Sequence, residues 1–184
     1  MIPPADTVRG RVSGYLFHHR ELLKSPVLEI GARRPDVPDP GTYDFKRQLG
    51  FHGDWIGIDL QNGPGVDIVH DICNSPPPGK YRTAVCAEVL EHIAHPSWAV
   101  SNIWTSLTSN SWALFTVPFV HPLHSYPEDY WRATPMGLRV LLEDAGFVDI
   151  EVVSIGAVSV PLKQHTGMQM RSIPLHVAGR GRRP

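Results

Sequence analysis

The five residues Val27-Leu28-Glu29-Ile30-Gly31 limit the possible folds of this chain more than any other stretch. An apolar run with one acidic residue, ending at a glycine, is typical of a buried strand whose carboxyl end meets a ligand. The glycine lets the backbone come close to that ligand, and the Glu29 carboxylate can accept hydrogen bonds from an amine or a hydroxyl. A second apolar run over 55–60 contains Asp59 at its end, where a carboxylate can hold a ribose. The two runs predict a nucleoside cofactor.

The turn after the first run narrows the choice of nucleoside. A dinucleotide-binding fingerprint needs G-x-G-x-x-G at this place, because glycine backbone wraps the pyrophosphate. This chain continues instead as Gly31-Ala32-Arg33-Arg34-Pro35, with no second or third glycine. The sequence therefore favours a nucleoside without phosphates.

Composition excludes several classes of function. The chain has 184 residues, 42% of them hydrophobic and 19% charged, as expected for one globular domain with a single sizeable core. A formal net charge of −1 gives no overall field for nucleic acid or an anionic membrane, and no apolar run approaches the ~20 residues of a membrane helix. The first residues lack the features of a signal peptide, so we expect a cytoplasmic protein with Cys73 and Cys86 reduced.

Hydrophobic periodicity predicts helices that alternate with short strands. The clearest helix covers 135–145, because Thr134 is a natural N-cap and Gly146 supplies a left-handed stop. The other expected helices cover 8–23, 43–49 and 97–107, and the expected strands cover 27–31, 55–60, 66–70, 83–87, 112–117, 147–155 and, as a hairpin partner, 168–177. This alternation predicts an α/β fold with a Rossmann-like, doubly wound, mostly parallel seven-stranded sheet and helices on both faces.

We expect three segments along the chain: an N-terminal helical segment over 1–26, the α/β domain over 27–178 and a flexible basic tail over 179–184. In a parallel sheet the carboxyl ends of the strands meet at one edge, where ligands bind. Residues at or just beyond such ends are Glu29, Gly31, Asp59, Asp71, Glu88 and Pro118. Their expected convergence is stronger evidence for a site than any single motif.

Together these stretches resemble the class I S-adenosylmethionine-dependent methyltransferases, in their widespread small-molecule, type 11-like branch. The resemblance covers about 27–155, some two thirds of the chain, and its motifs stand in the family's order. They are VLEIG at 27–31, GIDL at 57–60, VDIVHDI at 66–72, AEVLEHI at 87–93, and a C-terminal half from VPF at 117–119 through P-x-DYWR-x-T at 127–134 to L-x-x-x-AGF at 141–147. S-adenosylmethionine is the cofactor that this resemblance implies.

The resemblance assigns the adenosine half of the cofactor to four residues. Asp59 would accept hydrogen bonds from both ribose hydroxyls, a charge-assisted arrangement. Asp71 would accept from the adenine amino group while the Ile72 backbone N–H meets a ring nitrogen. Leu60 and Ile72 would pack on the two faces of the adenine.

The methionine half would lie against the first and fourth strands. Glu29, beside Gly31, would act on the ammonium group, and Glu88 with the Ala87 backbone would lie near the sulfonium. The family usually has further glycines where this chain has Arg33 and Pro35. Arg33 could place its guanidinium on the methionine carboxylate, or it could block the pocket, and the sequence leaves both open.

Methyl transfer to an alcohol also needs a base that takes the hydroxyl proton. The segment over 119–126 follows the fifth strand, and we expect its His124 to be that base, with His121 as the second candidate. Asp129, Tyr130 and Arg132 are expected to hold this loop or to bind polar groups of the substrate. This mixture of polar and aromatic side chains suits a sugar or another hydroxylated small molecule as the acceptor.

We expect no metal in this protein. The pairs His92/His95 and His121/His124 have suitable spacing, but the sequence shows no third acidic or cysteine ligand in register with them. Glu91 is most simply read as a solvated carboxylate at a helix start. The expected partner is a small-molecule acceptor, with no nucleic acid, no membrane and a possible homodimer.

Two other functions stay open. A non-catalytic, methyltransferase-like module that binds a partner or serves as a scaffold would explain the altered glycine turn. A nicotinamide-dependent oxidoreductase would need the glycines that are missing after Gly31.

Overall fold

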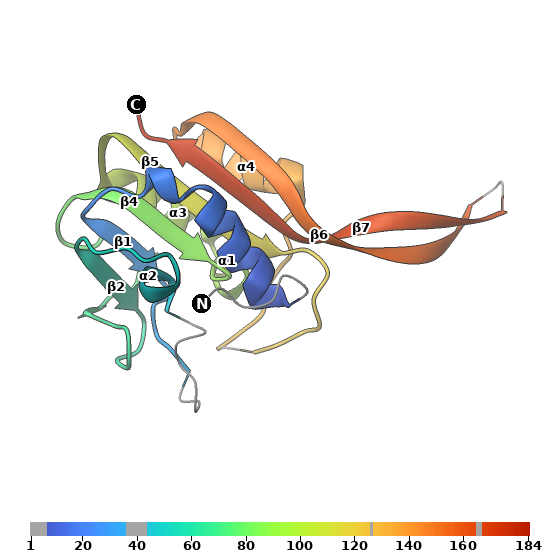
Figure 1. Cartoon of the computed structure of the whole chain (residues 1–184), viewed down its shortest axis with the longest axis horizontal. Coiled ribbons are helices and arrows are strands. Elements are labelled where there is room, and N and C mark those ends of the chain that lie inside the picture. Colours follow the sequence, from blue (N-terminus) through green and yellow to red (C-terminus); the bar gives the residue numbers. More distant parts are fainter. Residues whose placement is uncertain (1–6, 36–43, 126, 165–166) are drawn as a thin grey trace.

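A computed structural model describes residues 7–35, 44–125, 127–164 and 167–184 of the chain. Its centre is a seven-stranded sheet in the order β3-β2-β1-β4-β5-β7-β6, with helices on both faces (Figure 1). The strands are β1 (Val27–Ile30), β2 (Trp55–Asp59), β3 (Ile68–Val69), β4 (Tyr81–Ala87), β5 (Leu107–Pro118), β6 (Val148–Gln164) and β7 (Gly167–Arg182). β1 to β5 pair in parallel, whereas β7 is antiparallel to both β5 and β6. The predicted fold class is confirmed.

Two helices pack on one face of the sheet. α3 (Pro96–Ser106) and α4 (Pro135–Asp144) share an apolar cluster with alternate residues of the central strands, such as Leu28 and Phe115. α4 begins as predicted, because the Thr134 hydroxyl accepts a hydrogen bond of 3.0 Å from the N–H of Gly137. The buried stripe of α4 fixes the helix against the sheet, and α4 in turn lies behind β6 and β7 in Figure 1.

The opposite face is covered from the N-terminal part of the chain. α1 (Val8–His18), the 3-10 helix η1 (Arg20–Leu22) and the short α2 (Phe45–Gln48) lie over it. Their apolar residues form a second cluster with strand residues of the other parity, including Val27 and Leu114. The expected separation of 1–26 from the α/β domain therefore does not apply to the described part of that segment, since α1 is part of the core. None of the helices in the described segments is long and apolar enough to cross a lipid bilayer.

Three elements differ in length from the prediction. The helix expected over 8–23 ends at His18, and β3 has only two residues. Just before β3, the N–H of Asp67 donates to the carbonyl of Gly57 at 2.8 Å, and the Asp67 carboxylate accepts a hydrogen bond of 2.7 Å from the N–H of Gly57. β5 begins at Leu107 instead of 112, directly after α3, and its register against β4 shifts in this added part.

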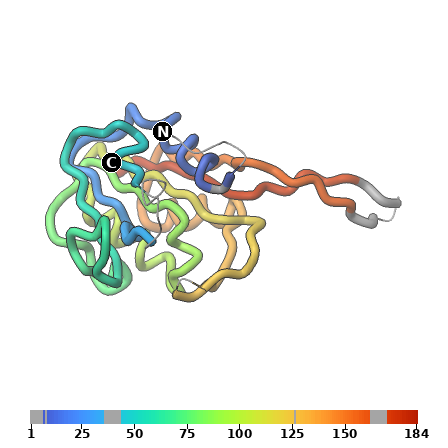
Figure 2. The backbone as a smooth tube through the Cα atoms, turned by 60° about the horizontal axis from the view of Figure 1, so that its bottom comes forward, coloured from blue at the N-terminus to red at the C-terminus, as the bar shows by residue number. Residues whose placement is uncertain are grey.

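The last two strands extend far beyond the sheet. β6 has 17 residues and β7 has 16, but only residues 176–182 of β7 pair with β5. Residues 157–164 and 167–174 pair only with each other and form an arm that projects from the body (Figure 2). The sequence predicted the hairpin but not the arm, because Pro161 and Pro174 weaken the strand pattern there.

The predicted flexible tail over 179–184 is wrong. Residues 179–182 are the end of β7 and lie between β5 and β6. Arg180 and Arg182 form ion pairs of 2.6 Å with Glu151 and Asp149 of β6. The basic residues that suggest disorder therefore have their partners about 30 positions earlier in the chain.

The glycines of this segment also have a packing reason. A Cβ atom at Gly181 would lie 2.8 Å from the Cβ of Phe147, and one at Gly179 would lie 3.0 Å from Leu138 Cδ2. Only glycine lets β7 lie this close to its neighbours. The alternation of glycine and arginine therefore matches a strand whose glycine face packs closely against the core and whose arginine face is charged.

We expect the backbone amides of residues 177–182 to exchange with solvent about 100-fold more slowly than those of 60–65, which lie in an irregular connection. The reason is that strand neighbours on both sides must separate before these amides open. Hydrogen exchange followed by mass spectrometry measures both segments in one experiment. Equal exchange rates in the two segments would instead support the prediction of a flexible tail.

Candidate active site

The carboxyl ends of β1, β2 and β4 lie side by side. Ile30 of β1 is in register with Ile58 of β2 on one side and with Cys86 of β4 on the other. The next residue of each strand is therefore at the same edge: Gly31, Asp59 and Ala87. Gly31 and Asp59, two of the strand-end residues that the sequence singled out, therefore lie at the same edge as Ala87.

Gly31 occupies a position that only glycine fits. Its φ is +71°, and a Cβ atom there would lie 2.4 Å from Cγ2 of Val89, in the segment that follows β4. The chain therefore passes close to the end of β4 immediately after β1. That Gly31 lets the backbone approach a ligand stays a prediction.

Asp59 is held in place by the backbone on both of its oxygens. Oδ2 accepts a hydrogen bond of 3.1 Å from the N–H of Arg33, and Oδ1 accepts one of 3.0 Å from the N–H of Gln61. A carboxylate oxygen can accept more than one hydrogen bond, so each oxygen keeps capacity for a ligand hydroxyl. The side chain is positioned in advance for bidentate contact.

The side chain of Arg33 lies over the connection between β2 and β3. Its Nε donates to the carbonyl of Asn62 at 3.4 Å, and its aliphatic part runs along Gly63. The contact of Arg33 with a methionine carboxylate stays a prediction, as does the alternative that it fills the pocket.

The residues expected around an adenine have different surroundings. Leu60 is 57% exposed at the rim, whereas Ile72 is buried in the cluster beneath α3. Asp71 directs one oxygen to the N–H of Cys73 at 2.8 Å. The exposed Leu60 is the side chain that the described structure leaves open to pack on a flat ring.

Glu29 is buried and has one strong donor. The indole N–H of Trp55 donates to its carboxylate at 2.5 Å. Burial raises the pKa of Glu29 from 4.5 to about 7, while the hydrogen bond from Trp55 acts in the opposite direction. An ammonium group beside this carboxylate would favour its charged form. Trp55 as its partner was not anticipated from the sequence.

A second group of polar side chains lies where β4 and β5 end, beside the middle of β7. Glu88 has a φ of +56°, and its Oε2 lies 3.2 Å from Nε2 of His176. His176 is completely buried, and neither of its ring nitrogens makes a hydrogen bond to a described residue. The sequence analysis missed His176, although a histidine within the apolar run Leu175-His176-Val177 is a detectable signal.

The prediction of a solvated Glu91 is wrong. Glu91 lies in the 3-10 helix η3 (Leu90–His92), is 1% exposed, and neither of its carboxylate oxygens makes a hydrogen bond within the described segments. The burial follows from the loop over 119–134, whose Tyr130 N–H donates to the carbonyl of Glu91 at 2.8 Å. Burial and then the nearby charge of Glu88 raise the pKa of Glu91 to about 9, whereas the positive charge of Arg132 acts in the opposite direction.

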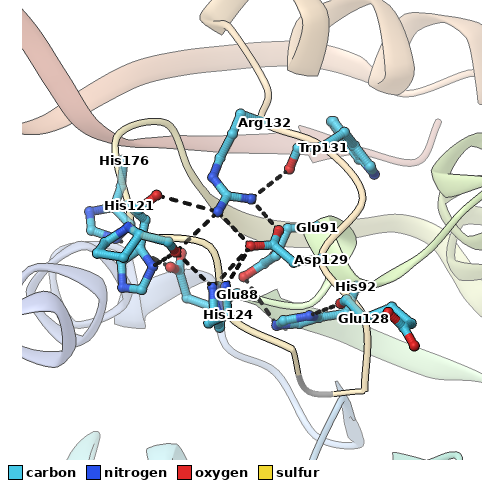
Figure 3. Close-up of polar contacts among 11 residues, drawn as sticks. Glu88, Glu91, His92, His121, His124, Glu128, Asp129, Trp131, Arg132 and His176 are labelled. Carbon is cyan, nitrogen blue, oxygen red and sulfur yellow. Dashed lines mark hydrogen bonds and ion pairs between the residues drawn. The ribbon is translucent and has the colours of Figure 1, made fainter.

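Asp129 and Arg132 hold the loop over 119–134 in shape (Figure 3). Both nitrogens of the Arg132 guanidinium bind the Asp129 carboxylate, and Arg132 also donates to the carbonyl of Trp131. This guanidinium, and next the N–H of His124, keep the pKa of Asp129 well below its usual range. Of the two roles expected for Asp129 and Arg132, the structure shows that of holding the loop.

Three histidine rings gather at this loop. The ring of His124 lies 4.6 Å from that of His121 and 4.8 Å from that of His92, measured between centroids. Nδ1 of His124 lies 3.2 Å from Oδ2 of Asp129, an arrangement that orients an imidazole. The side chain of Tyr130, in the same loop, is 54% exposed. The residues expected for catalysis and for substrate binding are therefore neighbours.

Neither a protein-family model nor a curated protein matches this sequence. A solved structure of an S-adenosylmethionine-dependent methyltransferase from Archaeoglobus fulgidus does match over 97% of this chain and 96% of its own, with a TM-score of 0.68 and 16% sequence identity. The chain has the class I methyltransferase fold. The resemblance inferred from the five motifs is confirmed at the level of the fold.

Two further structures share the class I methyltransferase fold with this chain. The 1,6-didemethyltoxoflavin-N1-methyltransferase of Burkholderia thailandensis, solved with its substrate and S-adenosylhomocysteine, has a TM-score of 0.61 at 15% identity over 97% of this chain and 79% of its own. The N-terminal domain of EvdMO1, solved in the presence of S-adenosylhomocysteine and D-fucose, has a TM-score of 0.60 at 14% identity over 97% and 85%.

Proposed function

We propose that this protein transfers a methyl group from S-adenosylmethionine to an oxygen, or a nitrogen, of a small hydroxylated acceptor. The observation that carries the proposal is Asp59, a carboxylate held by two backbone N–H groups beside Gly31 at the edge of a class I methyltransferase sheet. Proteins that share this fold were solved with S-adenosylhomocysteine, and one of them with D-fucose also present, which supports both the cofactor and a hydroxylated acceptor.

In this proposal the cofactor lies across the ends of β1 to β4. Asp59 accepts hydrogen bonds from the ribose hydroxyls, and Asp71 from the adenine amino group, with Leu60 on one face of the ring. Glu29 faces the methionine ammonium, and Glu88 lies near the sulfonium. A positive charge there offsets the cost of the buried, incompletely bonded Glu88 carboxylate.

The reaction is an in-line displacement in which the acceptor oxygen forms a bond to the methyl carbon while the bond from carbon to sulfur breaks. The protein contributes chiefly by alignment, which can lower such a barrier by about 7–11 kcal/mol. His124, oriented by Asp129, takes the hydroxyl proton, and His121 is the second candidate. Because Arg132 and Asp129 bind each other, Tyr130 is the one of these three expected substrate residues whose side chain is open to contact the acceptor.

Calorimetry with S-adenosylhomocysteine tests the cofactor, and transfer of a radiolabelled methyl group to a panel of hydroxylated small molecules tests the reaction. We expect the His124→Ala variant to bind the cofactor normally and to turn over about 10²–10⁴-fold more slowly, since general base catalysis contributes this much. His95→Ala, an exposed histidine outside the site, is the matched control with normal turnover.

Two results would contradict the proposal. If millimolar S-adenosylhomocysteine gives no heat, a non-catalytic binding module is the better interpretation. If NADH fluorescence instead changes on titration with the protein, the nucleoside site serves a nicotinamide cofactor.

A further inference from the structure

Glu91, His92 and His124 converge on one point beneath the loop over 119–134 (Figure 3). One ligand atom from each, a carboxylate oxygen and two imidazole nitrogens, lie within 4.8 Å of one another. The Glu91 carboxylate is buried and has no hydrogen-bond donor among the described residues. A buried carboxylate in this state is costly unless a cation or a proton occupies the site beside it.

We propose that these three side chains bind one divalent transition-metal ion, such as Zn²⁺ or Mn²⁺. Two imidazoles and one carboxylate form a ligand set that is common in catalytic zinc sites and in open transition-metal sites, where further positions remain for water or substrate. No metal was expected from the sequence, because no third acidic or cysteine ligand stands in register with the histidine pairs. The structure supplies that ligand in Glu91, which adjoins His92 and lies 33 residues before His124.

The contacts of His92 and His124 with the surrounding loop use Nδ1 of each ring, which leaves Nε2 for a metal. Nδ1 of His92 contacts the carbonyl of Glu128 at 2.5 Å, and Nδ1 of His124 lies 3.2 Å from the carboxylate of Asp129. Ligating histidines characteristically use their second nitrogen in this way, which fixes the ring and its tautomer. Nε2 of His92 then faces Glu91 Oε1 at 3.6 Å.

Two of the ligands are preformed and the third has a short distance to move. Ligand atoms on a tetrahedral zinc ion lie about 3.4 Å apart, close to the separation of Glu91 and His92. His124 lies in the loop over 119–134, outside η3, and its side chain is 35% exposed. A shift of about 1.4 Å in this loop residue, from the 4.8 Å limit to the spacing of about 3.4 Å, completes the site.

The surrounding charges favour a cation. Glu88, labelled close to this cluster in Figure 3, adds a second carboxylate to that of Glu91. The guanidinium of Arg132 is already paired, because both of its terminal nitrogens bind the Asp129 carboxylate. A dication therefore enters a region with two carboxylates near it and a positive group already paired.

For the role of the ion, this inference rests on the proposed function. A bound cation lowers the pKa of an acceptor hydroxyl that occupies an open position. With the ion bound, His124 is a ligand through Nε2 and no longer the base, so the hydroxyl proton passes to the second candidate, His121, whose ring lies 4.6 Å from that of His124. The oxygen bonds to the methyl carbon, the bond to sulfur breaks, and neutral S-adenosylhomocysteine leaves.

The test uses the whole chain after treatment with a chelator. Titration with Mn²⁺, followed by the electron paramagnetic resonance signal of the free ion, is expected to show one bound ion per chain. Glu91→Gln and His124→Asn should each weaken binding by about 100-fold or more, because each removes a ligand. His95→Asn, an exposed histidine three positions after His92, is the matched control and should bind as the wild type does.

Circular dichroism and S-adenosylhomocysteine calorimetry on each variant separate loss of the metal site from loss of the fold. Absence of Mn²⁺ binding, or equal weakening in His95→Asn and Glu91→Gln, overturns the metal site and leaves the proposed function standing. A protein that binds one Mn²⁺ at these ligands but no S-adenosylhomocysteine keeps the metal site and loses the proposed function.

Discussion

Replacing Asp59 with alanine is expected to weaken binding of S-adenosylhomocysteine by at least about 100-fold. Each hydrogen bond to a charged group contributes about 1.5–3 kcal/mol, and this variant loses two of them, so the loss is about 3 kcal/mol or more. Isothermal titration calorimetry measures it directly. Asp59→Asn keeps one accepting oxygen and loses the charge, so we expect it to lie between the wild type and Asp59→Ala.

The matched control for this prediction is Asp54→Ala. Asp54 stands just before the first residue of β2, at the opposite end of the strand that Asp59 ends, and it is exposed. Because Asp59 also binds the N–H groups of Arg33 and Gln61, thermal unfolding must show that Asp59→Ala retains its fold. If both variants bind the nucleoside like the wild type, Asp59 does not hold the ribose.

Replacing Glu29 with glutamine is expected to stabilise the protein and to weaken cofactor binding. The folded protein holds the Glu29 proton up to a pKa of about 7, whereas the unfolded chain loses it near 4.5. The free energy of unfolding therefore falls as pH rises from about 4.5 to about 7, and the deficit is complete above that range. Glutamine removes this charge but can still accept the Trp55 hydrogen bond, so we expect a gain of about 1–3 kcal/mol at pH 8.

The same change removes the negative charge proposed to face the methionine ammonium, and we expect about 10–100-fold weaker binding of S-adenosylhomocysteine. Urea unfolding at pH 5 and pH 8, together with calorimetry, measures both effects. Glu21→Gln, at a glutamate whose side chain is 62% exposed, is the control and should change neither. A Glu29→Gln variant with lower stability at pH 8, or with unchanged affinity, would refute the assignment.

The sequence could predict the parallel part of the sheet because its signals are local. The run over 27–31 is apolar and ends at a glycine, and its glycine is required by the close approach of Val89. Asp59 and Asp71 could be found in the same way, since Asp59 ends β2 and Asp71 comes two residues after β3. The helix over 135–144 carries its own cap and its own stop. The apolar run, the strand-end carboxylates and the helix cap depend only on neighbouring residues, whereas the contact of Gly31 with Val89 involves a distant part of the chain.

The buried acidic and histidine groups could not be predicted because distant segments bury them. Glu91 is covered by a loop that begins almost 30 residues later, and the sequence around it is equally compatible with an exposed helix start. His176 is buried only because β7 enters between β5 and β6. The arginines at 180 and 182 likewise gain partners from β6 that their local composition does not indicate.

The position of β7 between β5 and β6 imposes an order of assembly on the chain. As synthesis proceeds from the N-terminus, β1 to β5 can associate first, and β5 then has an open, apolar edge, since its neighbour in the complete sheet is β7. β6 emerges next and bonds to no strand but β7. The nascent protein is therefore most prone to pair with other chains just before its sheet closes, and a chaperone that shields extended strands would be most useful at this stage.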